Sequence, residues 1–334
     1  MQSLISPGRG LRPRHLRIPF IFKSQTRRIR RRESHQWRSA GSPPMPRQDG
    51  KVAIVTGGGG GIGYEVARHM AKLGARVIIG CRDEQQGLAA VEKIHEEYNE
   101  AEVEFKKLDL ASLQSVRQFV RSFKERDLPL NILVNNAGVM LVPEACTENG
   151  FELHFGVNYL GHFLLTCLLL DTLKLSGKSG NFSRVVNVSS SAHRNGEIRL
   201  NDLNCRQRYS AHAAYCHSKL AQLLFSSHLH RELEQGSFPV SSCAVDPGMV
   251  DTSLYRHLWT PLRLAHGLVS RLFFRTPTEG AATVLYAALS PTLEGECGGG
   301  YWVNGRRDAT TPLTFDPEVQ RLLWETSHRL LVPQ

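Results

Sequence analysis

The sequence has few of the features that mark a secreted or metal-binding protein. Its seven cysteines form no Cys-x-x-Cys pair and have no metal-ligand spacing with histidine. An odd, scattered set of thiols is typical of reduced cysteines packed in a core, so we predict neither a structural disulfide nor a metal site. The positions are Cys81, Cys146, Cys167, Cys205, Cys216, Cys243 and Cys297.

The formal net charge of +10 comes entirely from the first fifty residues. The first fifty residues hold 12 Lys and Arg against only two acids, Glu33 and Asp49, whereas the remainder carries 29 bases and 29 acids. A nucleic-acid-binding domain usually concentrates basic residues on one folded face. The sequence therefore predicts no nucleic-acid partner.

Residues 1–49 are rich in arginine and poor in acids, and they lack any stretch near the ~18–20 apolar residues that a membrane helix needs. This composition is typical of a disordered leader. The alternatives are a mitochondrial transit peptide, or an upstream extension with Met45 as the natural start. Prolines 43, 44 and 46 mark the boundary, and one domain is expected over residues 50–330.

From Lys51 onward, short β-branched runs alternate with long amphipathic segments. This order predicts a single-domain, doubly wound α/β (Rossmann) fold, with a parallel seven-stranded sheet and helices on both faces. The expected strands are 52–56, 76–81, 102–108, 132–135, 184–189, 240–245 and 300–303. The expected helices are 62–73, 84–99, 112–126, 151–175, 211–235 and 277–289.

A glycine-rich turn, Gly57 to Gly63, follows the first expected strand and opens the first expected helix. Glycines let the backbone approach a phosphate closely, and the free amides at a helix start favour an anion. Five consecutive glycines also suit a flexible loop, but the flanking strand and helix patterns argue against that reading. By itself the turn predicts a bound nucleotide and no particular reaction.

Six motifs recur in one order over about 200 residues, and together they resemble the short-chain dehydrogenase/reductase family. They are Thr56-Gly57-x-x-x-Gly61-x-Gly63, Asn135-Asn-Ala-Gly138, Asn158, Val188-Ser-Ser-Ser191, Tyr215-x-x-x-Lys219 and Pro247-Gly248-x-x-x-Thr252. Within the family, stretches such as Asn158-Tyr-Leu-Gly-His-Phe-Leu-Leu-Thr166 are most similar to the retinol dehydrogenase subgroup. Members of that subgroup usually carry a hydrophobic N-terminal anchor, and residues 1–49 depart from this pattern.

The resemblance implies hydride transfer with Tyr215 as acid or base, assisted by Lys219, Asn158 and a serine. A phenol has a reference pKa of about 10, and a nearby lysine cation favours the phenolate. Strand alternation leaves Ser189, Ser190 and Ser191 open, whereas the resemblance favours Ser190. The implied cofactor-binding residues are Thr56, Gly57, Gly61, Ile62, Gly63, Arg82, Asp109, Asn136, Ala137, Gly138, Tyr215, Lys219, Pro247, Gly248 and Thr252.

The choice of cofactor depends on the end of the second expected strand, which offers both Arg82 and Asp83. An acid there binds the ribose 2′-hydroxyl of NAD, whereas an arginine accepts the 2′-phosphate of NADP. Arg82 resembles the NADP-preferring retinol dehydrogenases, so NADP(H) is expected and NAD(H) is the alternative. Asp109 is expected near the adenine, or else as a turn residue before a helix.

Residues 253–275 alternate large apolar side chains with arginines. This pattern fits a lid over a lipophilic substrate that also contacts a membrane surface, or a stripe packed on the core. The resemblance implies retinoid- or polyisoprenoid-like alcohols and aldehydes, at the endoplasmic reticulum or lipid-droplet surface, with mitochondrial or cytoplasmic location as alternatives. The sequence is compatible with either a monomer or a homo-oligomer. Scattered histidines, such as His154 and His162, have no partner pattern and are interpreted as structural.

Two other functions compete with this hypothesis. A nucleotide-binding regulatory protein could keep the fold and lose turnover, although the intact Asn158, Ser190, Tyr215 and Lys219 set favours an enzyme. A sugar-nucleotide epimerase shares the Tyr-x-x-x-Lys pair. That class usually needs a larger C-terminal domain than the roughly 80 residues after Thr252.

Overall fold

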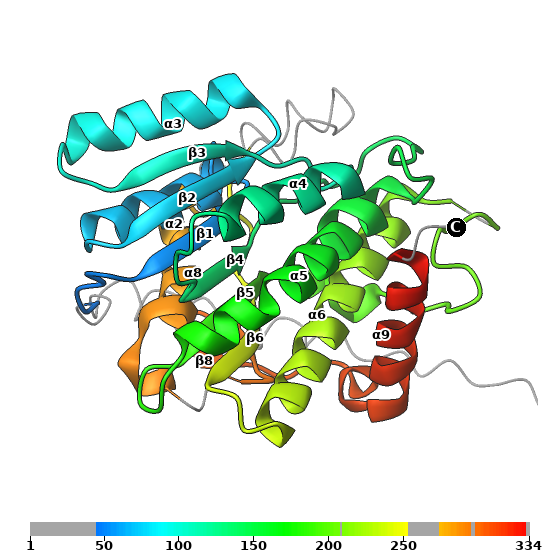
Figure 1. The fold of residues 1–334 in the computed structure, drawn as a ribbon. Coiled ribbons are helices and arrows are strands. Elements are labelled where there is room, and N and C mark those ends of the chain that lie inside the picture. The colour runs from blue at the N-terminus through cyan, green and yellow to red at the C-terminus, as the bar shows by residue number, and fades with distance from the viewer. Residues whose placement is uncertain (1–44, 208, 253–273, 295–297, 332–334) are drawn as a thin grey trace, which may run out of the picture. The chain divides into compact units, whose positions relative to one another are not determined.

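A single sheet organises the chain, with strand order β3-β2-β1-β4-β5-β6-β7-β8 (Figure 1). The computed structural model describes residues 45–207, 209–252, 274–294 and 298–331. The lid predicted at 253–275 lies outside these residues, apart from Phe274 and Arg275. The strands are β1 Val52–Thr56, β2 Arg76–Cys81, β3 Val103–Lys107, β4 Ile132–Asn135, β5 Ser183–Val188, β6 Val240–Asp246, β7 Tyr301–Val303 and β8 Arg306–Arg307.

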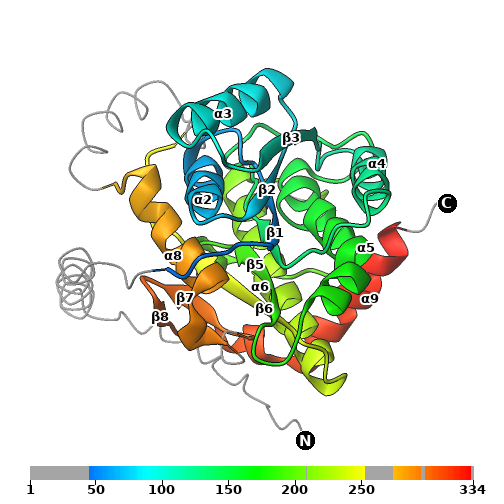
Figure 2. The same ribbon diagram turned by 60° about the vertical axis from the view of Figure 1, so that its left-hand side comes forward.

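Helices cover both faces of this sheet, as the alternating sequence predicts (Figures 1 and 2). One apolar core lies under α2 Gly61–Lys72, α3 Glu84–Glu97 and α8 Pro277–Leu289. The other lies under α4 Leu113–Lys124, α5 Gly161–Ser176, α6 Ala211–Gln235 and α9 Pro317–Leu331. Because β1, β2, β4, β5 and β6 are covered by helices on both faces, most of their side chains are buried, as in other parallel sheets, whereas the edge strand β3 is mostly half-buried.

The strand order places the carboxyl ends of β1 and β4 side by side, at the point where the chain reverses its direction of travel across the sheet. Ligands of doubly wound sheets bind in the crevice at such a point. The glycine turn follows β1 and the Asn136–Gly138 segment follows β4. The topology therefore brings two of the predicted motifs to one crevice.

The prediction of seven strands was wrong by one, because β8 adds an antiparallel edge strand. Asn304 and Gly305 both have positive φ angles, 54° and 71°, and they close a two-residue turn that pairs Val303 with Arg306. Asn-Gly turns of this kind are favoured between antiparallel strands. The dipeptide was the signal for this hairpin in the sequence.

The sequence analysis also missed α9. Its buried positions are Gln320, Leu323, Ser327 and Leu331, so two of the four side chains on its inner face are polar and the apolar periodicity is weak. The start of the helix carried a clearer signal, because Asp316 accepts hydrogen bonds from the amides of Glu318 and Val319, and Pro317 takes the first helical position.

The predicted helix over 151–175 is divided in the structure. A π-helical turn, Phe155–Leu160, leads into α5, and the Gly161 amide donates to the Gly156 carbonyl five residues back. Among the described residues, the stretch Phe155–Ser176 is the one helix long and apolar enough to cross a membrane by composition, and 67% of its most apolar window is buried in this domain. Its apolar side chains belong to the core between α4 and α6.

Because Leu323 of α9 is only 1% exposed and packs in the core with α6, truncating it should leave a cavity. We expect Leu323→Ala to lower the free energy of unfolding by about 2–5 kcal/mol in urea titration. Glu325→Ala, on the exposed side of the same helix, should change it by less than about 0.5 kcal/mol. Equal effects of the two substitutions would contradict this assignment of the core.

Candidate active site

The glycine turn between β1 and α2 forms one wall of a cavity of about 250 Å³. Gly57 and Gly61 have φ angles of +68° and +55°, a region that glycine adopts without strain. A β-carbon on Gly63 would lie 2.4 Å from the Gly57 carbonyl oxygen, so a side chain is excluded there. No side chain caps the start of α2. Its first amides are therefore free to bind an anion.

The cavity is lined by four segments that lie far apart in the sequence, which is the form expected of a dinucleotide site. The lining residues are Gly57, Gly59, Gly60, Gly61, Ile62, Cys81, Arg82, Asp83, Gln86, Asn136, Ala137, Gly138, Val139, Met140 and Thr252. A β-carbon on Gly57 would lie 2.9 Å from Ala137. Only bare backbone fits between the turn and the opposite wall, and this close approach suits a bound pyrophosphate.

The Thr56 side chain joins the glycine turn to the Asn136–Gly138 segment. Its hydroxyl oxygen accepts hydrogen bonds from the amides of Asn136 and Ala137, both at 2.9 Å, and Asn136 Nδ2 donates back to the Thr56 carbonyl. His162 Nε2 lies 2.8 Å from the same hydroxyl, and His162 Nδ1 lies 3.0 Å from the Asn158 carbonyl oxygen. Burial lowers the pKa of His162 to about 3, so its ring links the two groups as a neutral imidazole.

Asn158 lies in the π-helical turn and holds the backbone after Gly138. Its Oδ1 accepts from the Val139 amide at 2.7 Å, and its Nδ2 donates to the Val139 carbonyl at 3.0 Å and to Ser218 Oγ at 2.9 Å. Ser218 in turn donates to the Tyr215 carbonyl at 2.7 Å. One amide side chain therefore links the cavity wall to the helical turn that carries Tyr215.

Tyr215 and Lys219 lie one turn apart near the start of α6, and both are buried. Lys219 Nζ lies 5.9 Å from the centre of the Tyr215 ring and donates to the Val188 carbonyl at 2.7 Å. Burial lowers the pKa of Lys219 to about 8, although the carboxylate of Asp246 acts in the opposite direction. The ammonium still predominates at neutral pH, where it favours the phenolate of Tyr215.

The three serines after β5 have different environments. The hydroxyl of Ser189 is buried and donates to the Lys219 carbonyl at 3.1 Å, so its proton is already used. Ser190 is half-buried, and its oxygen accepts from the Ala192 amide at 3.2 Å. Ser191 is exposed, and its amide donates to Asp246. These contacts favour Ser190 as the hydroxyl that polarises a substrate.

Asp246 has a positioning role that the sequence analysis did not assign. Its carboxylate, 5% exposed, accepts from the Ser191 and Gly248 amides at 2.8 Å and from the Tyr301 hydroxyl at 2.9 Å. It thus joins the serine loop to the Pro247–Gly248 segment. The signal was an acid directly before a Pro-Gly pair, but two of its three partners, Ser191 and Tyr301, lie 55 residues away along the chain.

Beyond Asp246, the predicted covering loop returns toward the glycine turn. Thr252 lines the cavity, and a β-carbon on Gly61 would lie 3.2 Å from the Thr252 methyl group. The carbonyl of Pro247 accepts from the guanidinium of Arg275 at 3.2 Å, which supports the loop from the outside. The motif residues from both ends of the domain therefore meet at this cavity.

The three candidate adenosine contacts, Arg82, Asp83 and Asp109, differ in their surroundings. Arg82 is exposed on the cavity wall and has no hydrogen-bond partner among the residues that the structure describes. Asp83 next to it is engaged, because its carboxylate accepts from the Gln86 amide and caps α3. Asp109 does not line the cavity, and its carboxylate accepts from the Ala111 amide at 3.0 Å. Those are the contacts of a turn residue before α4, so an adenine contact of Asp109 stays a prediction.

No group of three or more potential metal ligands occurs in the described part of the chain. The chemistry that this arrangement supports is proton transfer at a buried phenol, beside a cavity whose walls suit a dinucleotide.

Comparison with known proteins gives one consistent result. The family model described as short chain dehydrogenase matches residues 51–262. Polyprenol dehydrogenase of Danio rerio is 55% identical over 289 residues, which cover 86% of this chain and 89% of that protein. Human polyprenol dehydrogenase is 49% identical and covers 85% of this chain and 86% of its own length. Human retinol dehydrogenase 12 is 45% identical, with coverages of 84% and 86%.

Solved structures agree in fold. The crystal structure of an uncharacterized protein from Mycobacterium paratuberculosis is 35% identical, has a TM-score of 0.69, and covers 86% of this chain and 95% of that chain. The Pseudomonas aeruginosa RhlG/NADP active-site complex is 24% identical, with a TM-score of 0.62 and coverages of 83% and 99%. At that lower identity the likeness concerns the fold alone.

The buried Lys219 should make the stability of the ligand-free protein depend on pH. Its pKa is about 8 in the folded state, whereas the ordinary lysine value of 10.5 applies to the unfolded chain. Between these values the unfolded chain binds a proton that the folded protein lacks, so the free energy of unfolding should rise with pH. Below about pH 8 the lysine lowers that free energy by roughly 3 kcal/mol.

We therefore expect Lys219→Met to raise the free energy of unfolding at neutral pH and to remove the rise between about pH 8 and 10. Urea titrations at several pH values measure both effects. Lys93→Met, on the exposed surface of α3, is the control and should leave the slope as it is in the wild type. A Lys219→Met protein with the wild-type slope would contradict the assigned pKa.

Proposed function

The chain belongs to the short-chain dehydrogenase family, and from that premise we propose that it transfers a hydride between a nicotinamide cofactor and a lipophilic alcohol or aldehyde, with Tyr215 as the acid or base. The observation that carries the proposal is the buried Tyr215–Lys219 turn, which Ser218 and Asn158 connect to the wall of the cavity beside the glycine turn. The family consists of NAD(P)-dependent oxidoreductases, and the polyprenol and retinol dehydrogenases among the relatives support a lipophilic substrate.

In the proposed mechanism Ser190 and Tyr215 contact the reacting oxygen of the substrate, whereas Lys219 and Asn158 assist Tyr215. The nicotinamide, when bound, supplies the hydride for reduction or accepts it in oxidation. Ser190 donates a hydrogen bond to the carbonyl oxygen, and Tyr215 gives that oxygen a proton as the alcohol forms. In the reverse direction the phenolate removes the alcohol proton. Lys219 stabilises the phenolate and holds the ribose, and Asn158 completes a water-linked proton path.

We assign NADP(H) as the preferred cofactor because of the unequal surroundings of Arg82 and Asp83. The Asp83 carboxylate is engaged in capping α3, whereas the Arg82 guanidinium lies exposed on the cavity wall. An arginine in this position suits a 2′-phosphate, which it binds in a planar, two-pronged contact. NAD(H) remains the alternative cofactor.

The substrate end is inferred from the relatives and from the sequence of residues 253–275. We propose that this segment covers a retinoid- or polyisoprenoid-like substrate and contacts a membrane surface at the endoplasmic reticulum or lipid droplets. Mitochondrial and cytoplasmic locations are the alternatives, and a homo-oligomer is compatible with the proposal. We propose a basic leader over residues 1–49 and a catalytic domain over residues 50–330.

The phenol of Tyr215 can be tested by removing its oxygen. We expect Tyr215→Phe to lower kcat/KM for lipophilic aldehydes by about 10²–10⁴-fold, while the dissociation constant of NADPH changes little. Tyr98→Phe makes the same chemical change beyond the end of α3 and should leave turnover as it is. Equal slow turnover in the wild type and in Tyr215→Phe would favour a nucleotide-binding regulatory protein instead.

The cofactor assignment predicts a selective effect at Arg82. Since hydrogen bonds to charged groups contribute about 1.5–3 kcal/mol, Arg82→Ala should raise the KM for NADPH by at least about tenfold and change the KM for NADH far less. Arg68→Ala on α2, where the guanidinium pairs with Glu65 and Glu97, is the matched control. An unchanged KM for NADPH in Arg82→Ala would refute the assignment.

A further inference from the structure

Leu141 has an unusual backbone for a branched side chain. Its φ is +53°, in the left-handed region that residues other than glycine rarely adopt. It follows Val139 and Met140, which line the cavity, and precedes Val142, which is 4% exposed. Such a conformation persists only where the surrounding structure holds it. The contacts of this short segment should therefore reveal what holds it.

The backbone is held on both sides of Leu141. On one side, the Asn158 amide group binds both the N–H and the carbonyl of Val139. On the other, the Val142 N–H donates to His154 Nε2 at 3.4 Å, and the Val142 carbonyl accepts from the Tyr209 hydroxyl at 2.9 Å. Leu141 and its peptide bonds thus lie between two fixed backbone units.

The contact on the Val142 side depends on a buried acid–histidine pair. Glu152 is 3% exposed and His154 is fully buried, and Glu152 Oε1 lies 2.7 Å from His154 Nδ1. Burial alone would raise the pKa of Glu152, but hydrogen bonds from the His154 ring and from the amides of His154 and Phe155 lower it below its ordinary value. A charged Glu152 keeps the proton on Nδ1. Nε2 is then free to accept from Val142.

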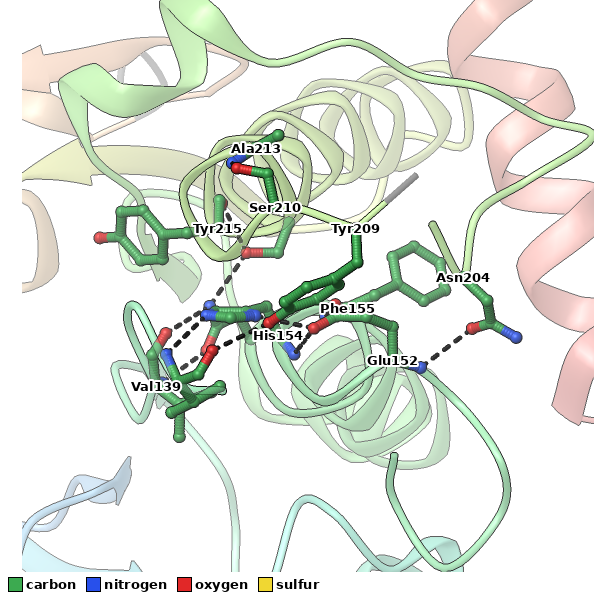
Figure 3. Close-up of polar contacts among 12 residues, drawn as sticks. Val139, Glu152, His154, Phe155, Asn204, Tyr209, Ser210, Ala213 and Tyr215 are labelled. Atoms are coloured by element: carbon green, nitrogen blue, oxygen red, sulfur yellow. Dashed lines mark hydrogen bonds and ion pairs between the residues drawn. The ribbon is translucent and has the colours of Figure 1, made fainter. Parts of the chain in front are cut away.

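The same histidine also packs against the proposed catalytic tyrosine. The rings of His154 and Tyr215 meet edge to face, with centroids 6.2 Å apart and an interplanar angle of 68°. Figure 3 shows the Tyr215 hydroxyl directed away from the Glu152–His154 pair. His154 therefore contacts the body of the tyrosine and the backbone of the Leu141 segment together, without reaching the phenol oxygen.

We propose that Glu152, His154 and Tyr209 are positioning residues that hold Leu141 in its left-handed conformation and so fix an apolar wall of the substrate site beside Tyr215. This inference rests on the proposed function, because it assumes a lipophilic substrate at Tyr215. Val139 and Met140 line the cavity directly after Gly138, and a β-carbon on Gly138 would lie 3.8 Å from Lys219 Nζ, so this part of the lining approaches the Tyr215–Lys219 turn. Leu141 is the next apolar residue in the sequence. A wall whose backbone is fixed can favour apolar substrates without contributing a group to the chemistry.

A double-mutant cycle between His154→Phe and Leu141→Gly tests the proposal. Phenylalanine keeps a ring against Tyr215 and removes both polar contacts of the histidine. We expect His154→Phe to lower kcat/KM for lipophilic aldehydes by up to about 100-fold, with little change in the KM for NADPH. Because glycine adopts positive φ readily, the same change should cost at least about twofold less in the Leu141→Gly background. Equal losses in both backgrounds would overturn the proposal.

A matched control is His228→Phe. His228 is also a buried histidine, but it lies on α6 and packs against Trp324 of α9. We expect its effect on kcat/KM to be the same in the wild-type and Leu141→Gly backgrounds. Coupling of similar size at this remote site would mean that Leu141→Gly acts through global stability, and the proposal would fail.

Amide hydrogen exchange tests the positioning role without any turnover. His154→Phe, and the milder Tyr209→Phe, should speed exchange in the peptide that contains 139–142 and leave the glycine turn unchanged. Unchanged exchange in 139–142 would overturn the proposal. Faster exchange with unaltered kcat/KM would overturn the substrate wall. Faster exchange in a protein whose wild type turns over no lipophilic substrate would instead reject the proposed function.

Discussion

The hydroxyl of Thr56 is the interaction on which the arrangement of the site depends. It lies at the end of β1 and is fully buried. There it accepts hydrogen bonds from the first two backbone amides after β4 and forms a hydrogen bond with the neutral ring of His162. These bonds set the separation between the glycine turn and the Asn136–Gly138 wall. They also reach the Asn158 carbonyl through His162. Since a parallel sheet brings strand ends together but leaves the loops beyond them free, a side-chain bond is needed to join the loops.

From this junction the polar contacts continue to the end of the site that holds Tyr215. Asn158 binds Val139 and, through Ser218, the Tyr215 turn, while Asp246 binds the serine loop and the loop that leads to Thr252. Each link is a buried side chain that holds backbone groups. The buried Lys219 lies among them at a cost in stability, which is characteristic of functional groups whose pKa is shifted by burial.

The sequence predicted the parts of the fold that local pattern determines. The bounds of β1, β2, β4, α6 and α8 agree with the prediction to the residue, because apolar periodicity and capping residues mark their ends. The helix α9 was missed because polar Gln320 and Ser327 occupy half of its buried face, and β8 because two residues are too few to show a period. The π-helical turn has no period of its own to detect in a chain that otherwise reads as one helix.

The candidate site shows the same division between local and distant information. Tyr215, Lys219 and the glycines belong to short motifs whose spacing carries the chemistry, so they could be named from the sequence. His162, Asp246 and the Glu152–His154 pair act through partners on other elements, and no local pattern distinguishes them from ordinary core residues. Glu152 and His154 are only two positions apart, yet their proposed role depends on contacts with Val142 and Tyr215, which lie in other segments of the chain.

The two ends of the cavity are consequently built by different means. The nucleotide end consists largely of bare backbone, where glycines exclude side chains and leave amides open, as a ligand common to many enzymes allows. At the Tyr215 end, side chains hold the backbone, and Leu141 keeps a left-handed backbone conformation there. Side-chain contacts can change without altering the sheet. This difference explains how a fold shared with many dehydrogenases can accept a distinct class of substrate.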